Sequence, residues 1–106
     1  MHVSYATTSD GRVVAVEANS RTDGHAETRL LRRLEELDLS DDTGLTMTVV
    51  RVANTSRSGR VEFRNSKPCL GCRMAILGSA LPIERICWST EEGTLTSCDP
   101  KDLSRV

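Results

Sequence analysis

Apolar residues recur along this chain with two different periods. Four runs in which β-branched and apolar residues dominate predict the main strands, over residues 3–9, 12–18, 45–52 and 83–90. The dipeptide Asp10-Gly11 between the first two runs predicts a two-residue hairpin turn. Val13-Val14-Ala15-Val16 is continuously apolar, which predicts that the second strand is buried.

The other period predicts two helices. Over residues 25–39 the apolar side chains are spaced three or four apart, with charged residues between them, at Ala26, Leu30, Leu31, Leu34 and Leu37. Asp23 precedes this pattern and is the expected N-cap. A second helix is expected over residues 69–80, with Pro68 at its first turn.

Short segments complete the order of elements. Residues 60–64 predict a short returning strand, and Glu91-Glu92-Gly93 predicts a tight return into a last strand at 94–97, antiparallel to its neighbour. The main elements follow the order β-β-α-β-α-β-β, which predicts an α/β fold with a helix-covered, mixed five-stranded sheet. A length of 106 residues predicts a single domain spanning residues 1–106.

Composition narrows the functional class only slightly. Lys and Arg number 14 and Asp and Glu 15, so the net charge of −1 argues against a surface that is basic throughout. The longest uncharged apolar stretch, residues 74–83, is far shorter than the roughly 20 residues that span a bilayer. The first residues lack the basic-then-apolar pattern of a secretory signal, so we expect a cytoplasmic or other intracellular protein that does not bind membranes.

The four cysteines are more informative than the composition. Without an export signal a disulfide framework is not expected, and the C-x-x-C spacing of Cys69 and Cys72 favours metal binding or redox chemistry. Cys87 and Cys98 are expected to be small core side chains.

Two motifs at predicted helix starts combine into a metal-binding pattern. His25-Ala26-Glu27 opens the first helix, and Pro68-Cys69-Leu70-Gly71-Cys72 opens the second. His25, Cys69 and Cys72 provide three ligands for one Zn²⁺ and leave a fourth position for water, as in catalytic zinc sites. Glu27, two residues from His25, is placed to move protons to and from that water.

This combination of motifs resembles the cytidine deaminase superfamily, whose zinc enzymes use one His, two Cys and a Glu that is not a ligand. The resemblance implies a three-layer cytidine-deaminase-like fold and hydrolytic conversion of cytosine to uracil, with Glu27 as the catalytic proton shuttle. It also implies substrate contacts from Asn19, from the backbone amide of Ala26, from the backbone at Pro68 and from the strand end that carries Trp88. Lys67 stands where many members have a Ser, with Ser66 one residue earlier.

Other interpretations of the same residues remain open. His25 and Glu27 can be ordinary first-turn residues, with Glu27 solvated and favoured by the helix dipole. Cys69 and Cys72 can form a redox pair, although they do not follow the first strand of a βαβ unit. A closed structural zinc site that uses Cys87 or Cys98 as its fourth ligand is a further alternative. Trp88 can equally be a core residue, and Asn19 can be an ordinary turn residue.

The substrate is suggested by local charge. Residues 51–73 hold six basic residues and one acidic residue and run into the second motif, so part of this segment is expected to rim the site, unless it only solvates a strand edge. The expected phosphate contacts are Arg21, Arg64, Lys67 and Arg73. We therefore expect a deaminase acting on cytosine in DNA or RNA. The alternatives are a free cytidine, deoxycytidine or (d)CMP deaminase, an adenine-specific relative, and a non-catalytic zinc-stabilised binding module; oligomers are possible.

Overall fold

The computed structural model describes residues 2–19, 25–37, 44–54, 61–64, 66–67, 70–79 and 81–105. Side chains are described for all of these except residues 52–54, 61–64, 70 and 104–105. Cys69, Pro68, Arg21 and Asp23 fall outside the described residues.

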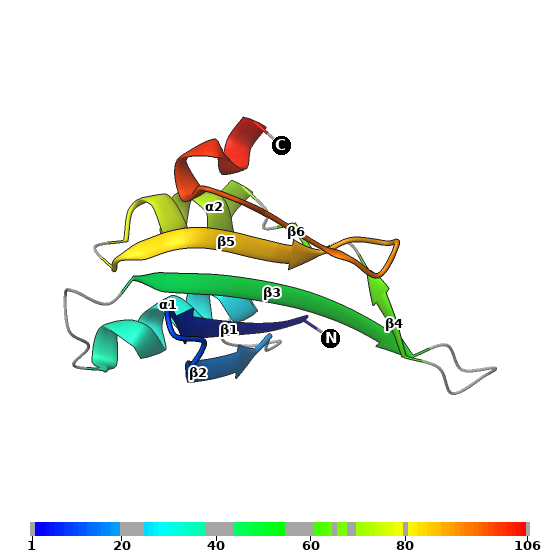
Figure 1. The fold of residues 1–106 in the computed structure, drawn as a ribbon, viewed down its shortest axis with the longest axis horizontal. Coiled ribbons are helices and arrows are strands. Elements are labelled where there is room, and N and C mark those ends of the chain that lie inside the picture. The colour runs from blue at the N-terminus through cyan, green and yellow to red at the C-terminus, as the bar shows by residue number, and fades with distance from the viewer. Residues whose placement is uncertain are drawn as a thin grey trace.

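The elements alternate between strands and helices in an α/β arrangement (Figure 1). In chain order they are β1 (His2–Thr8), β2 (Val13–Ala18), α1 (Ala26–Glu36), β3 (Leu45–Asn54), β4 (Val61–Arg64), α2 (Leu70–Leu77), β5 (Ile83–Ser89), β6 (Leu95–Cys98) and the 3₁₀ helix η1 (Pro100–Arg105). The short returning strand expected over residues 60–64 is present as β4, so the described sheet has six strands where the main order of elements predicted five.

The strands form one mixed sheet around β3. The main path runs β2-β1-β3-β5-β6, and β4 pairs with the last four residues of β3. β3 and β5 are parallel because the chain returns through α2 before entering β5, whereas the other pairs are antiparallel. The expected mixed sheet is therefore present, with β4 added at one end.

Both hairpins close with three-residue loops. In the hairpin between β1 and β2, this loop replaces the two-residue turn expected at Asp10-Gly11. In the first, the N–H of Gly11 donates to the C=O of Thr8 at 2.9 Å, and Gly11 has a φ of 85°. The second repeats this geometry, with Gly93 donating to Thr90 and a φ of 82°. A positive φ after a type I turn is the usual three-residue hairpin, and glycine adopts it without a Cβ penalty.

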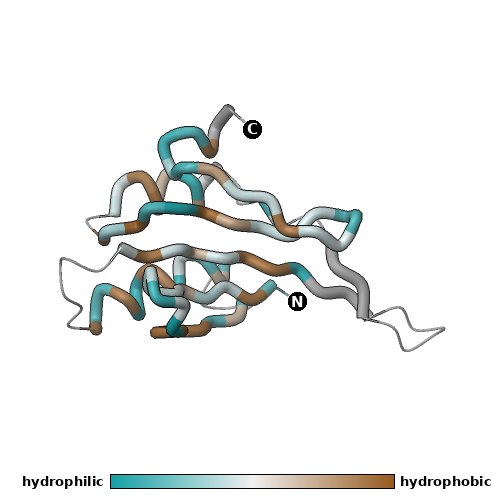
Figure 2. Tube along the Cα trace, viewed as in Figure 1, coloured by the Kyte–Doolittle hydropathy of each residue, from teal (hydrophilic) through white to brown (hydrophobic). Residues whose placement is uncertain are grey.

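All described helices cover the same face of the sheet. Their side chains and those of β1, β3 and β5 form a single apolar cluster whose buried members include Leu30, Leu34, Ile76, Leu103, Ala6, Leu45, Met47, Ile86 and Trp88. Figure 2 shows apolar positions recurring along β3 and β5 at the centre of the sheet. The expected three-layer arrangement is therefore not found in the described part of the chain, which has two layers, because one cluster takes in every described helix.

The second strand is an edge strand and is not buried as its apolar run predicts. Val16 lies opposite Tyr5, next to the buried Ala15, so the alternation of the strand places it on the face away from α1. A register shift between Ala6 and Thr7 places an extra β2 residue at this point and brings Val13 to the same face. Their exposed fractions are 54% and 52%, whereas Ala15 is buried under α1.

The helix boundaries also differ from the expectation. α1 ends at Glu36, and its N-cap is His25 where Asp23 was expected. α2 occupies Leu70–Leu77 within the expected 69–80. No helix among the described residues has the length and apolar character needed to cross a membrane.

A core substitution in α1 tests this packing. Leu34 is 1% exposed in the apolar cluster, whereas Leu37 at the end of the same helix is 38% exposed. Leu34→Ala is expected to lower the free energy of unfolding by about 2–5 kcal/mol through lost burial and a cavity. Leu37→Ala is expected to cost about 1 kcal/mol or less. Chemical denaturation of both variants measures the difference, and equal losses would contradict the assigned helix face.

Candidate functional site

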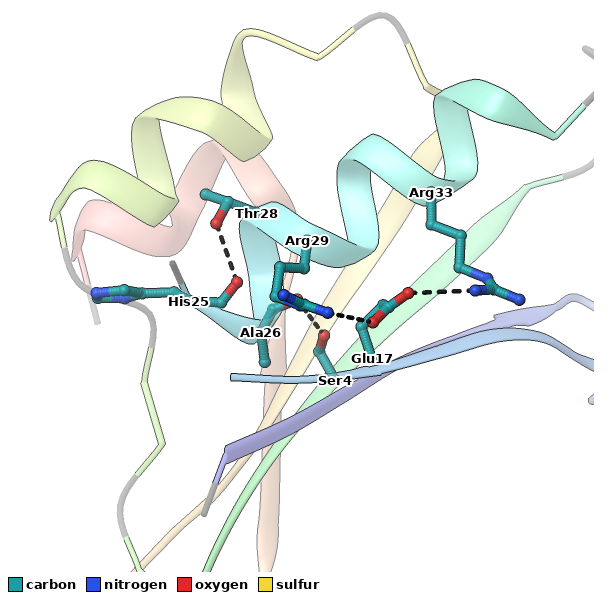
Figure 3. Close-up of polar contacts among 7 residues, drawn as sticks. All are labelled: Ser4, Glu17, His25, Ala26, Thr28, Arg29 and Arg33. Carbon is teal, nitrogen blue, oxygen red and sulfur yellow. Dashed lines mark hydrogen bonds and ion pairs between the residues drawn. The ribbon is translucent and has the colours of Figure 1, made fainter. Parts of the chain in front are cut away.

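His25 stands at the N-terminus of α1 with its backbone held in a fixed, extended conformation. Its φ and ψ are −77° and 154°, as expected for an N-cap. The C=O of His25 accepts the N–H of Arg29 at 3.1 Å and the hydroxyl of Thr28 at 3.0 Å. Figure 3 shows the imidazole projecting beyond the first turn of α1, so that the ring is presented at the end of the helix.

The start of α1 is fastened to the sheet by buried and charged contacts (Figure 3). The hydroxyl of Ser4, which is fully buried in β1, donates to the C=O of Ala26 at 2.7 Å. Further along the helix, Glu17 of β2 accepts from Arg29 at 3.5 Å and from Arg33 at 3.3 Å. These contacts fix the position of the first turn of α1 relative to β1. They thereby also fix the position of Glu27, the residue that follows Ala26.

Glu27 and Cys72 are both buried at helix starts. Glu27 is 5% exposed in the first turn of α1, which rules out the interpretation of this residue as a solvated surface acid. Cys72 is 2% exposed and lies in the first turn of α2, which contacts α1. The positive end of each helix dipole favours a carboxylate and a thiolate at these positions.

The two helix starts bring three metal-binding side chains together. One ligand atom each from His25, Glu27 and Cys72 lies within 4.8 Å of the others. Nδ1 of His25 is 3.3 Å from Sγ of Cys72. Two atoms bound to the same zinc at about 2.0–2.1 Å and about 2.3 Å with a tetrahedral angle lie about 3.6 Å apart. The observed spacing is close to this value, and an imidazole with a thiolate is a donor pair that suits zinc.

A buried serine network holds the chain just ahead of the second motif. Ser66 and Ser89 are 3% and 1% exposed. The Ser66 hydroxyl donates to the C=O of Val49 at 2.7 Å, accepts from the N–H of Ser89 at 2.8 Å and lies 2.8 Å from the Ser89 hydroxyl. The N–H of Ser66 donates to the C=O of Ser89 at 2.9 Å. Ser66, three residues before Cys69 in the sequence, is thereby fixed to the middle of β3 and to the last residue of β5.

Two expected substrate contacts lie near this site and are tied into the fold. Asn19 is exposed after β2, and its Oδ1 accepts the backbone N–H of His2 at 3.0 Å. Ala26, whose amide was expected to contact the base, is fully buried as the first residue of α1. Trp88 is 5% exposed within the apolar cluster, which favours its alternative interpretation as a core residue.

The expected phosphate contacts are only partly described. Lys67 and Arg73 are half-buried on either side of the second motif, and Nε of Arg73 is buried without a hydrogen bond to any described residue. Arg64 is placed by its backbone in β4 alone, and Arg21 lies outside the described residues.

The two remaining cysteines do not join the cluster. Among the described residues only His25, Glu27 and Cys72 form a group of metal-binding side chains. Cys87 is half-buried in β5, and Cys98 packs against the apolar cluster from β6. Burial raises the pKa of the Cys98 thiol, and the Asp102 carboxylate raises it further, so Cys98 stays protonated at neutral pH. A closed zinc site with a third cysteine from β5 or β6 is therefore not supported.

Three residues of this site were not singled out as functional from the sequence. Ser4 and Ser66 are buried polar residues with several partners, and His2 lies at the start of β1 beside Asn19. Their roles depend on contacts between segments that are distant in the chain. Such contacts leave no recognisable pattern in a single sequence. No protein-family model matches the chain, and no curated protein matches its sequence.

Removing a ligand is expected to abolish metal binding. His25→Ala and Cys72→Ala each delete one donor of the cluster, so both variants should lose stoichiometric Zn²⁺ after dialysis against limiting metal. Saturating Zn²⁺ at about 100 times its dissociation constant should stabilise the unaltered protein by about 2.7 kcal/mol, and these variants far less. Cys87→Ser is the matched control and should retain the metal. Loss of zinc from Cys87→Ser, with retention in Cys72→Ala, would contradict the assignment.

The serine network is expected to affect metal affinity as well as stability. Ser66→Ala removes the hydroxyl that donates to the C=O of Val49 and accepts the N–H of Ser89, and the loss of these buried hydrogen bonds should cost about 1–3 kcal/mol in unfolding free energy. Because Ser66 precedes the second motif, its loss should also weaken Zn²⁺ binding, measured by competition with a chelator. Ser4→Ala, which breaks the bond to Ala26, is the comparison on the other helix. A stability loss without any change in zinc affinity would show that Ser66 is only structural.

Proposed function

We propose that this protein is a zinc-dependent hydrolytic deaminase that converts cytosine to uracil. The observation that carries the proposal is the cluster itself. A buried Glu27 carboxylate lies within 4.8 Å of an imidazole nitrogen and a thiol sulfur, at the adjoining starts of two helices. A metal-binding pair with a carboxylate beside it is the arrangement that activates and deprotonates water.

The ligands would be His25 and Cys72 together with Cys69, which lies outside the described residues and precedes Cys72 by three residues in the C-x-x-C motif. When bound there, zinc would supply an acidified water molecule for attack on the ring. Three protein ligands leave room for that water, whereas a fourth would close the site. On this proposal Glu27 is not a ligand, although it lies close enough to compete for the metal.

Glu27 does the proton chemistry of the proposed reaction. Its carboxylate accepts a proton from the attacking water and delivers it to the ring nitrogen next to the amine-bearing carbon. Glu27 then takes the second proton from the hydroxyl group added to the ring carbon and passes it to the amine. The carbon–nitrogen bond breaks, ammonia leaves, and the carbon–oxygen bond becomes the carbonyl of uracil. Burial at 5% exposure keeps bulk water from competing for these protons.

The surrounding residues would bind the base and its sugar. The first backbone amides of α1, beginning at Ala26, point out of the helix start and suit the base carbonyl. Asn19 is exposed nearby and retains its side-chain amide group as a donor. The basic segment over residues 51–73 supports a phosphate-bearing substrate, so we propose cytosine in DNA or RNA, with free nucleotides as the alternative.

Replacing the proton shuttle is expected to stop turnover without loss of metal. Glu27→Gln keeps the size of the side chain but cannot accept a proton, so kcat should fall by a factor of about 10²–10⁴ or more. Ammonia release and uracil formation are followed with deoxycytidine, dCMP and cytosine-containing oligonucleotides, single- and double-stranded.

The matched control is Glu35→Gln on the exposed side of α1, which should leave kcat and zinc content unchanged. Turnover in Glu27→Gln close to that of the unaltered protein would remove Glu27 from the mechanism. Zinc binding without a product from any substrate would instead favour a zinc-stabilised binding module.

A further inference from the structure

A row of basic residues crosses the sheet just beyond the candidate site. His2 at the start of β1 lies directly opposite Arg51 in β3, and Arg51 lies opposite Arg64 in β4. Residues that face each other in a ladder point to the same side of the sheet. The side chains of His2 and Arg51 therefore lie next to each other on one face of the sheet. Arg64 is the residue of β4 that is paired with Arg51, and it extends the row by one strand.

The face that carries these two side chains is the one covered by the helices. His2 is two residues from Ser4, and Arg51 is two residues from Val49. Ser4 and Val49 are opposite each other and fully buried, and Ser4 donates to the C=O of Ala26 at the start of α1. Alternate residues of a strand share a face, so the His2–Arg51 pair follows on the same side, about 7 Å further along the strands.

Burial changes over this short step. Ser4 and Val49 are 0% exposed, His2 is half-buried and Arg51 is exposed. The pair therefore lies where the helix cover ends, between the buried cluster and solvent. On this face, His2 and Arg51 are the paired strand residues that follow Ser4 and Val49 in the direction of solvent.

Charge links the pair to the cluster. The pKa of His2 is lowered, first by burial, while the Glu27 carboxylate raises it and the Arg51 and His25 groups lower it. These groups are therefore close enough to affect one another. His2 is mainly neutral at pH 7, so its ring offers a hydrogen-bond donor, and Arg51 supplies the positive charge. No carboxylate among the described side chains forms an ion pair with Arg51.

We propose that His2 and Arg51 form a phosphate subsite next to the reacting centre, which selects cytosine nucleotides over free nucleosides. The inference rests on the proposed function, since it takes the cluster of His25, Glu27 and Cys72 as the place where the base reacts. The guanidinium of Arg51 presents a planar pair of donors that matches two phosphate oxygens. The His2 ring adds a neutral donor at the inner edge of the phosphate.

The test is a comparison of kcat/KM for four zinc-loaded proteins on three substrates. The substrates are deoxycytidine, dCMP and a single-stranded oligonucleotide with one cytosine. The proteins are the unaltered chain, Arg51→Ala, Arg51→Lys and the control Arg85→Ala. Arg85 is also an exposed strand arginine, but it lies in β5 with its hydrogen bond to Ser97 of β6, on the other face.

Arg51→Ala is expected to lower kcat/KM for phosphate-bearing substrates by about tenfold to a hundredfold, through KM, since bonds to charged groups are the strong ones. Deoxycytidine should change less than about twofold, since it offers the arginine no phosphate. Arg51→Lys should recover part of the loss, and Arg85→Ala should match the unaltered protein. A loss confined to dCMP identifies a free nucleotide as the source of the phosphate, and a loss confined to the oligonucleotide identifies a strand.

An equal effect of Arg51→Ala on all three substrates, or none on any, would overturn the subsite while leaving the deaminase proposal in place. If the unaltered protein deaminates none of them, the proposed function fails. In that case, calorimetric measurement of the affinities for dCMP and deoxycytidine tests the phosphate subsite separately. Arg51→Ala should lower the affinity for dCMP and leave the affinity for deoxycytidine unchanged. Equal binding of dCMP to both proteins would reject it.

Discussion

The approach of two helix starts over one face of the sheet is the constraint on which the site depends. His25 and Cys72 are 47 residues apart in the chain, yet Nδ1 of His25 lies 3.3 Å from Sγ of Cys72. An imidazole, a thiol and a buried carboxylate within 4.8 Å of one another form a possible metal-binding triad. A cation held there would balance the charges of a thiolate and a carboxylate.

The sheet supplies the positions from which this approach follows. Ser4 fixes the first turn of α1 to β1, and Ser66 fixes the chain before α2 to β3 and β5. The two serines thus connect the two halves of the cluster to three neighbouring strands of one sheet, β1, β3 and β5. Beyond them the ladder continues to His2 and Arg51, so the surface around the cluster is built from the ends of those same strands.

Much of this arrangement follows from local pattern, and the failures have physical causes. The alternating strands, the apolar stripe of α1 and the H-x-E and C-x-x-C motifs are local signals, and the structure brings His25, Glu27 and Cys72 together as those motifs predict. The burial of Val13 and Val16 was predicted wrongly, because an apolar run does not reveal an edge strand or a register shift. The first hairpin loop is one residue longer than expected, because a glycine with a positive φ is compatible with both two-residue and three-residue loops. The second loop has the three residues Glu91-Glu92-Gly93 that were expected. The serine anchors depend on contacts between distant segments, which no local pattern encodes.

The central claim is that one zinc is held by His25, Cys72 and Cys69, with Glu27 beside it and water in the remaining position. X-ray absorption at the zinc edge of the loaded protein tests this claim most directly, because it counts the ligand atoms by type. The account predicts two sulfur atoms at about 2.3 Å and two nitrogen or oxygen atoms at about 2.0–2.1 Å. Three sulfur atoms around the metal, or a protein that takes up no zinc, would contradict it.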